Sequence, residues 1–248
     1  MCSFCRAAIV ISFLLASVCT ATAQSIPTEM WLPPLAPTGT APQTREFPSS
    51  VYDPISNRLI MFGGCTGGTG GCNFSVQAFN DVWVLTNANG SGGVPAWIQL
   101  TPTGGPPSVR HGHTVVYDGA TNRMVIFGGD SSLGSLPNLS DVWVLENANG
   151  LDRSTGLPAT PIWTQLAPLP GPTAREFSRA VYDPFTNRMI VYSGTVCPTL
   201  ATCQPTNEVW ALTNANGLGG TAQWIHLSPH WRSARSSKLV DRGLRSLL

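Results

Sequence analysis

The sequence predicts an all-β protein built from about three copies of one four-stranded unit, with one extra strand before the first copy. Three similar blocks occupy residues 45–64, 110–129 and 175–194, and each lies 65 residues from the next. A fixed period of this length indicates an array of one supersecondary unit. Each block is followed by a Trp-x-Leu segment (Val-Trp-Val-Leu twice and Val-Trp-Ala-Leu) and then by a Trp-x-x-Leu segment. The units therefore cover residues near 45–100, 110–166 and 175–227.

Each unit divides into four predicted strands, A to D. Strand A ends in Val-Tyr-Asp, B runs from Asn-Arg to a Gly-Gly or Ser-Gly pair, C holds the Trp-x-Leu segment, and D starts at Trp97, Trp163 or Trp224. The B segments are short β-branched and aromatic runs, typical of strands buried on both faces. A further Trp-x-x-Leu at Trp31 predicts the single extra strand. No stretch has a convincing helical pattern.

The links between these strands have turn chemistry. An Asp followed by Ser/Thr-Asn-Arg joins A to B, and Asn-Ala-Asn-Gly joins C to D at Asn87, Asn147 and Asn214. Asn tolerates the left-handed region, and Asp accepts backbone N–H bonds, so both links read as tight turns. A calcium loop is disfavoured because acidic partners are missing at ligand spacing. Arg58, which follows the first hairpin, is expected to pair with its Asp across the turn, as are its counterparts in the other units.

These units resemble the kelch repeat, the blade of a β-propeller in the superfamily of the galactose oxidase central domain. The resemblance runs from Trp31 to about Leu227 and rests on Gly63-Gly64, Gly128-Gly129 and the strand D tryptophans. The period exceeds the roughly 50 residues typical of kelch, so the extra residues belong in the B–C and C–D connections. Closed propellers have about four to eight blades. The resemblance thus predicts a propeller fragment.

The N-terminal residues 1–23 read as an export signal. Arg6 precedes an apolar segment over residues 7–18, and small residues predict cleavage after Ala23. Twelve apolar residues are too few to span a bilayer. Lipid attachment at Cys19 is the less favoured alternative, because the residues before it suit a lipidation site poorly. We expect a secreted or periplasmic protein whose blades occupy residues 24–229.

The tail, residues 230–248, abandons the repeat pattern and carries five basic residues against one acid. Read one nucleotide later, codons for the residues from His230 to Ala234 can encode Thr-Gly-Gly-Pro-Pro, the residues at 103–107. Codons that start at Asp241 can likewise encode Thr-Val-Val-Tyr-Asp-Pro. We interpret the tail as a fourth blade read out of frame.

Sequencing the gene tests this interpretation. Deleting one nucleotide near the Pro229 codon is expected to open a frame that continues into Asn-Arg and a B strand ending in Gly-Gly. Downstream nucleotides that encode no such repeat in any frame would contradict it.

Charge argues against a nucleic-acid partner. Residues 25–229 contain 8 Arg, no Lys and 12 acidic residues, a net charge of −4. Phosphate binding needs a basic face. The basic tail is interpreted as a product of the frame change, not as a binding element.

Four cysteines remain after the export signal. Cys65 and Cys72 lie in the B–C loop of the first unit, and Cys197 and Cys203 lie in that of the third. Two local disulfides fit an oxidising compartment. Zinc binding is the alternative, but both gaps are wider than usual for zinc ligands.

The rim that carries the D–A and B–C loops, here called the loop rim, is the predicted recognition surface. Its loops differ between units, whereas the hairpin rim, with the A–B and C–D turns, is nearly constant. Variable loops on a repeated scaffold usually carry recognition. The candidate binding residues begin strand A in each unit: Arg45, Glu46, Arg110, His111, Arg175 and Glu176. The arginines could instead be structural and bond carbonyls of the next blade, which is the interpretation we favour.

No catalytic constellation is found, and no cofactor or metal is expected. His111 and His113 occur in one unit only, and no further ligands accompany them. The resemblance also admits a copper oxidase similar to galactose oxidase, but the tyrosines are repeat positions and each mature cysteine has a nearby partner.

We expect an exported, non-catalytic propeller that binds a protein or a carbohydrate at the loop rim. The alternatives are a fragment of a secreted propeller enzyme or a product without function. Open blade edges predict dimerisation or aggregation.

Overall fold

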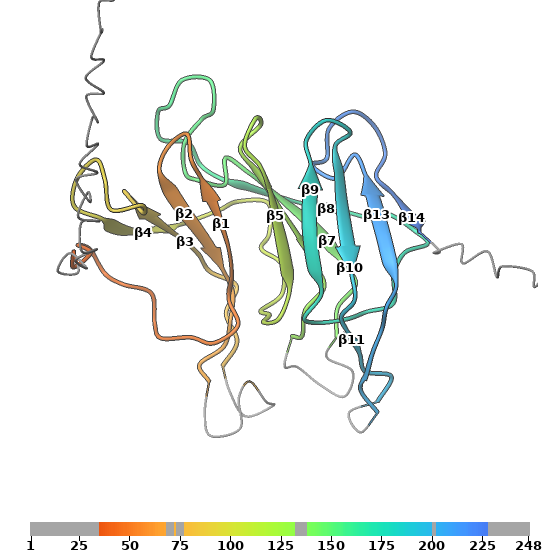
Figure 1. Cartoon of the computed structure of the whole chain (residues 1–248). Coiled ribbons are helices and arrows are strands. Elements are labelled where there is room, and N and C mark those ends of the chain that lie inside the picture. Colours follow the sequence, from red (N-terminus) through yellow and green to blue (C-terminus); the bar gives the residue numbers. More distant parts are fainter. Residues whose placement is uncertain (1–34, 68–71, 73–76, 132–137, 200–201, 228–248) are drawn as a thin grey trace, which may run out of the picture. The chain divides into compact units, whose positions relative to one another are not determined.

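The computed structural model describes residues 35–67, 72, 77–131, 138–199 and 202–227. These residues fall within one compact unit, Leu35–Leu248. They form β-strands and no helix, which confirms the all-β prediction (Figure 1). The predicted strand at Trp31, the export signal at residues 1–23 and the tail at residues 230–248 lie outside the described residues.

Three antiparallel sheets of four strands correspond to the three predicted units and are called blades 1 to 3. Blade 1 consists of β1 (Ser49–Asp53), β2 (Arg58–Phe62), β3 (Val82–Thr86) and β4 (Ala96–Leu100). Blade 2 consists of β5 (Thr114–Asp118), β6 (Arg123–Phe127), β7 (Val142–Glu146) and β8 (Ile162–Leu166). Blade 3 consists of β9 (Arg179–Asp183), β10 (Arg188–Tyr192), β13 (Val209–Thr213) and β14 (Gln223–His226). A small hairpin of β11 (Thr195–Val196) and β12 (Gln204–Pro205) lies in the B–C loop of blade 3.

The hairpin chemistry acts as predicted. In blade 1 the Asp53 carboxylate accepts bonds from the Ile55 backbone N–H and the Ser56 hydroxyl, and Asn57 adopts a φ of 52°. The same pattern recurs in blades 2 and 3. The first Asn of each C–D link also has positive φ, so these links are turns.

The A strands β1, β5 and β9 lie side by side, with blade 2 in the middle (Figure 1). Apolar cores fill the two spaces between blades. Phe62 belongs to the core between blades 1 and 2, and Phe127 belongs to the core between blades 2 and 3. Each contacts the strand D tryptophan of the following blade edge to face, Trp163 and Trp224 respectively.

Polar contacts at the hairpin rim also join neighbouring blades, and here one expectation was wrong. Arg58 lies opposite Asp53 in the strand register, but its guanidinium donates to the Asn149 carbonyl of blade 2 at 2.7 Å. The Asn149 side chain in turn donates to Asp53 at 2.7 Å. Blades 2 and 3 repeat this arrangement. Arg123 donates to the Asn216 carbonyl at 3.3 Å, and the Asn216 side chain donates to Asp118 at 2.8 Å.

The segment that leads into a blade also pairs, through one parallel backbone bridge, with strand D of that same blade. Thr103, in the link from blade 1 to blade 2, pairs in parallel with β8. Thr38 pairs with β4 in the same way. The segment before blade 1 therefore behaves as a D–A link.

Both predicted cysteine pairs, Cys65 with Cys72 and Cys197 with Cys203, are at disulfide distance within their own B–C loops.

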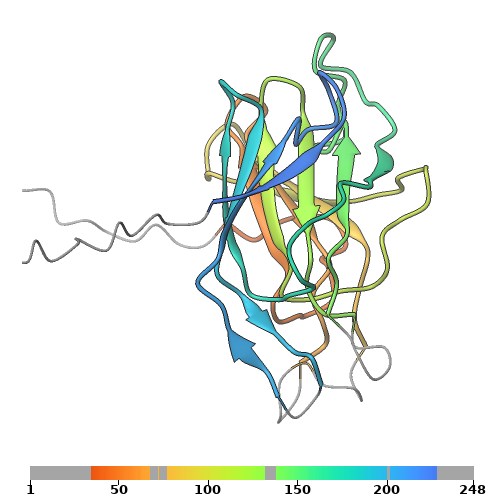
Figure 2. The same ribbon diagram turned by 90° about the vertical axis from the view of Figure 1, so that its right-hand side faces the viewer.

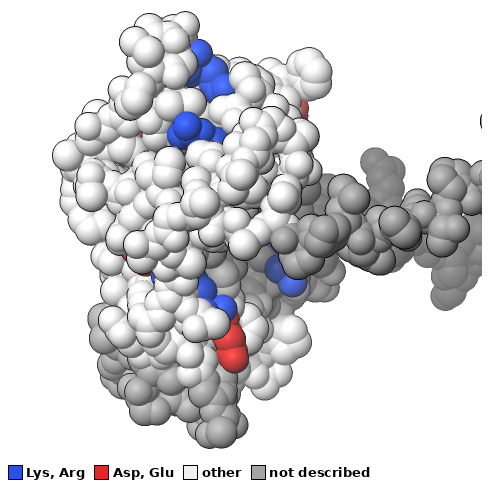
Figure 3. Space-filling model, turned by 90° about the vertical axis from the view of Figure 1, so that its left-hand side faces the viewer, with Lys and Arg blue, Asp and Glu red and all other residues white. Residues whose placement is uncertain are grey.

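The loop rim lies at the bottom of Figure 1, with the A–B hairpins at the top. Figure 2 looks onto the side of blade 3, and Figure 3 looks onto the opposite side, which carries few charged groups.

Candidate functional site

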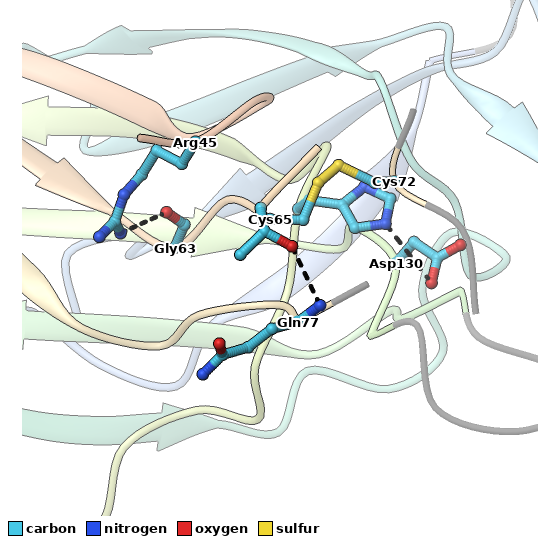
Figure 4. Close-up of a disulfide and its surroundings, with 8 residues drawn as sticks. Arg45, Gly63, Cys65, Cys72, Gln77 and Asp130 are labelled. Carbon is cyan, nitrogen blue, oxygen red and sulfur yellow. Dashed lines mark hydrogen bonds and ion pairs between the residues drawn. A yellow bond between two sulfur atoms is a disulfide. The ribbon is translucent and has the colours of Figure 1, made fainter. Parts of the chain in front are cut away.

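The repeated arginines at the loop rim bind within their own blades. Arg45 donates to the Gly63 carbonyl at 2.9 Å (Figure 4). It also donates to both carboxylate oxygens of Asp81, at 2.6 and 2.9 Å. Trp83 shares that carboxylate through its indole N–H. Each arginine thus ties the start of strand A to the end of strand B and the start of strand C.

The same contacts recur around Arg110, with Gly128 and Asp141, and around Arg175, with Ser193 and Glu208. The side chains of Arg110 and Arg175 are 0% and 1% exposed. Burial leaves them little access to a ligand. The arrangement favours the structural interpretation, although the carbonyls belong to the same blade and not to the next one.

The residue after each arginine is a glutamate in blades 1 and 3 and a histidine in blade 2. Glu46, His111 and Glu176 occupy this position, and each backbone pairs with the first residue of its own B–C loop: Cys65, Asp130 and Thr195. Glu46 is exposed, His111 is buried and Glu176 is half-buried. Of these three side chains, the two glutamates are accessible to solvent and His111 is not.

The next position holds Phe47, Gly112 and Phe177, all with positive φ of 50° to 60°. The Gly112 N–H donates to the Phe47 carbonyl, and the Phe177 N–H donates to the Gly112 carbonyl, so the three positions are linked across the blades. A Cβ at Gly112 would lie 3.0 Å from a ring carbon of Phe177. Because glycine leaves this space free, the two phenylalanine rings meet edge to face, with centroids 5.4 Å apart.

These two rings border a recess of about 170 Å³. Its remaining lining comes from the start of the A strands and includes Ser49, Ser178 and Arg179. A second recess of about 290 Å³ continues along β1, β5 and β9. Phe47 is 46% exposed and Phe177 is 42% exposed. We call this region, from the two rings to Arg179, the inner mouth.

Titratable groups beside the inner mouth have shifted pKa values. Burial, aided by the nearby Asp130 carboxylate, raises the pKa of Glu176 to about 7. Burial lowers the pKa of His111, against the opposing effect of Asp130, whose carboxylate oxygen lies 4.0 Å from its Nε2. Burial and the charge of Arg110 lower the pKa of His113 to about 3. Both histidines are therefore mostly neutral at pH 7, and Glu176 keeps its proton to a higher pH than an ordinary glutamate does.

The model of the KLHDC2/KLHL20/DRC7 Kelch-repeats domain matches residues 20–151. The chain belongs to the kelch-repeat family. No curated protein matches the chain.

Two solved structures resemble the kelch blades. "Structure of YjhT" is 13% identical and covers 74% of this chain and 70% of that chain, with a TM-score of 0.39. A cryo-EM structure of RAG in complex with one melted and one unmelted RSS is also 13% identical, with a TM-score of 0.51. It covers 81% of this chain and 56% of that one. At 13% identity, the resemblance to the RAG structure indicates a shared fold only.

The predicted site residues of this kelch protein are partly brought together. Glu176 and His111 both lie near Asp130 at the inner mouth, whereas the Glu46 side chain points toward Gly67 in the B–C loop. The sequence interpretation missed Phe47 and Phe177. Their signal is a Phe in blades 1 and 3 at a position where the middle repeat has Gly. Within the described ranges, no three His, Cys, Asp or Glu residues group to hold a metal ion.

Proposed function

We propose that this kelch protein is an exported, non-catalytic binding module that holds a segment of a partner protein at the inner mouth. Kelch repeats support a protein-binding role. The observation that carries the proposal is the pair of exposed phenylalanines, Phe47 and Phe177, held at positive φ.

The backbone at these two positions argues for a retained function. Bulky residues at positive φ are uncommon and cost roughly 1 kcal/mol or more each. Glycine fills the matching position of blade 2 without that cost. Two exposed rings that meet edge to face offer a rigid apolar contact at low entropic cost, as aromatic anchors do in protein interfaces. Packing within the blades leaves both residues exposed, with relative exposures of 46% for Phe47 and 42% for Phe177.

A glycan is the second candidate ligand. The inner mouth combines the two rings with Arg179, and the half-buried Glu176 carboxyl lies beside Gly112 at its border. Such a combination can contact the apolar face of a sugar and bond its hydroxyl groups.

Export is supported by the two cysteine pairs, because disulfides persist in oxidising compartments. None of the described residues forms a helix long and apolar enough to cross a membrane.

The double variant Phe47→Gly, Phe177→Gly tests the proposal, since it copies blade 2 at both positions. Removing the rings should weaken binding, while relief of positive φ keeps the free energy of unfolding within about 1 kcal/mol of wild type. Peptides selected from a displayed random library on the wild-type protein should lose at least about tenfold in affinity for this variant. A glycan array probed with both proteins tests the second candidate.

Phe185→Gly is the control, because Phe185 is 96% exposed in the hairpin of blade 3, at the opposite rim. It should bind the selected peptides as wild type does. Peptides that bind the double variant equally well, or a library that yields no binder, would overturn the protein-binding proposal. Loss of bound glycans instead would favour the second candidate.

A further inference from the structure

Neighbouring blades in this chain are joined by one repeated set of apolar contacts. Phe62 meets Trp163 at a centroid distance of 5.2 Å between blades 1 and 2, and Phe127 meets Trp224 at 5.1 Å between blades 2 and 3. Beside Phe127, Val116 on strand A is 5% exposed. Each interface thus pairs strands A and B of one blade with strand D of the next.

The polar part of the set is repeated as well. The second Asn of the C–D turn donates to the hairpin Asp of the preceding blade, at 2.7 Å from Asn149 to Asp53 and 2.8 Å from Asn216 to Asp118. Both Asp side chains are almost fully buried. A blade therefore has an acceptor face, with the Asp, and a donor face, with the Asn and the strand D Trp.

Blade 3 shows its acceptor face uncovered among the described residues. Val181 is 63% exposed and Tyr192 is 52% exposed, although their counterparts in blade 2, Val116 and Phe127, are buried. Asp183 is bonded within its own hairpin by Phe185 and Thr186. This is the side of the molecule that faces the viewer in Figure 2.

Blade 1 shows the matching donor face uncovered. Asn89, the counterpart of Asn149, is exposed, and its Oδ1 accepts bonds from Asn57 and Ser91. Its Nδ2, the atom that reaches the Asp in the other two interfaces, bonds no group among the described residues. Figure 3 shows this side of the chain, where charged side chains are sparse. A face with few charged groups suits burial against another blade.

We propose that the acceptor face of blade 3 binds the donor face of blade 1 in a second copy of this chain. The two faces carry the two halves of one contact set, so Asp183 receives the Asn89 side chain and Tyr192 packs on Trp97. Two copies that exchange both contacts form a two-fold dimer. Their six blades fall within the four to eight of closed propellers.

Asn89→Asp tests the donor face with little effect on the blade itself. A carboxylate keeps the oxygen that Asn57 and Ser91 bond, but it replaces the donor with a charge opposite Asp183. In sedimentation velocity, the wild-type chain should be a dimer, and this variant should associate at least about tenfold more weakly. The double variant Asn89→Asp, Asp183→Asn exchanges donor and acceptor and should recover the dimer.

Tyr192→Glu tests the acceptor face and should also give a monomer. Phe185→Glu is its control, because Phe185 lies at the hairpin tip, where the blade 1 counterpart Ile55 stays 71% exposed despite the neighbouring blade. That control should remain dimeric. Mixing the Asn89→Asp and Tyr192→Glu proteins should restore one contact and yield a mixed dimer, because the intact acceptor face of the first can bind the intact donor face of the second.

A wild-type chain that stays monomeric at high micromolar concentration would overturn the proposal. So would an assembly that resists both variants, or one that Phe185→Glu disrupts equally. None of these measurements contains a ligand, so their outcome is independent of binding at the inner mouth.

Discussion

Replacing Arg110 by alanine is expected to lower the free energy of unfolding by about 3–5 kcal/mol. The Arg110 side chain is fully buried and satisfies both carboxylate oxygens of Asp141 together with the Gly128 carbonyl. Its removal leaves the largely buried Asp141 carboxylate with the Trp143 indole N–H as its remaining side-chain donor, takes the guanidinium from the Gly128 carbonyl, and opens a cavity in blade 2. A buried ion pair that loses one partner costs more than the pair contributes net, because the remaining charge stays desolvated.

Urea denaturation followed by tryptophan fluorescence measures this loss. Arg179→Ala is the control, since Arg179 is an exposed arginine of blade 3 and its loss should change stability by no more than about 0.5 kcal/mol. A change below about 1 kcal/mol for Arg110→Ala would show that the buried arginine is not a structural element. Unchanged stability with impaired ligand binding would instead restore the arginines as recognition residues.

The strands and turns could be predicted from the sequence because their causes are local. The Asp and Asn residues that close each A–B hairpin act on backbone groups within four residues, as around Asp53 and Asn57. The repeat then multiplies the signal, since the same turn appears at Asp118 and Asp183. Both disulfide pairings were also local, because each pair closes a single B–C loop.

Contacts between blades could not be assigned from local chemistry. Arg58 stands beside Asp53 in the hairpin, yet it bonds the Asn149 carbonyl, 91 residues away. The repeat shows only that both residues recur, not which blade supplies the partner. That choice depends on how tightly adjacent sheets pack, and this is set by side chains such as Phe62 and Trp163.

The inner mouth was missed for a related reason. The arginines drew attention because they are repeated, but repetition here accompanies burial and intrablade bonding. Phe47 and Phe177 break the pattern of the middle repeat, where Gly112 adopts the same positive φ. A phenylalanine at a repeat position where the backbone needs positive φ, and where another repeat has glycine, is the signal that points to a binding role.

His113 is expected to make the folded state sensitive to acid. The ring packs edge to face on Phe62 between blades 1 and 2, and neither nitrogen has a hydrogen-bond partner among the described residues. Burial lowers its pKa from 6.5 to about 3, so the unfolded chain binds a proton between these values and the folded chain does not. The stability that His113 contributes is therefore complete above pH 6.5 and is lost as the pH falls toward 3.

Glu176 should act in the opposite direction within an overlapping range. Its pKa is raised from 4.5 to about 7, so the folded state holds the proton more tightly, and this stabilisation is lost as the pH rises from 4.5 through 7. The two groups partly cancel in the wild-type protein between pH 4.5 and 6.5, and single variants should separate them.

Unfolding free energies of wild type, His113→Phe and Glu176→Gln at closely spaced pH values test this pair. Wild type minus His113→Phe should rise by up to about 1.4 kcal/mol per pH unit between pH 4 and 6, because one proton is linked to unfolding. Wild type minus Glu176→Gln should fall as the pH rises over the same interval. Glu46→Gln, at the matching exposed position of blade 1, is the control for loss of an acid at this rim. A difference between wild type and His113→Phe that stays flat between pH 4 and 6 would contradict the burial of His113 as a neutral ring, because a histidine on the surface gives no such slope.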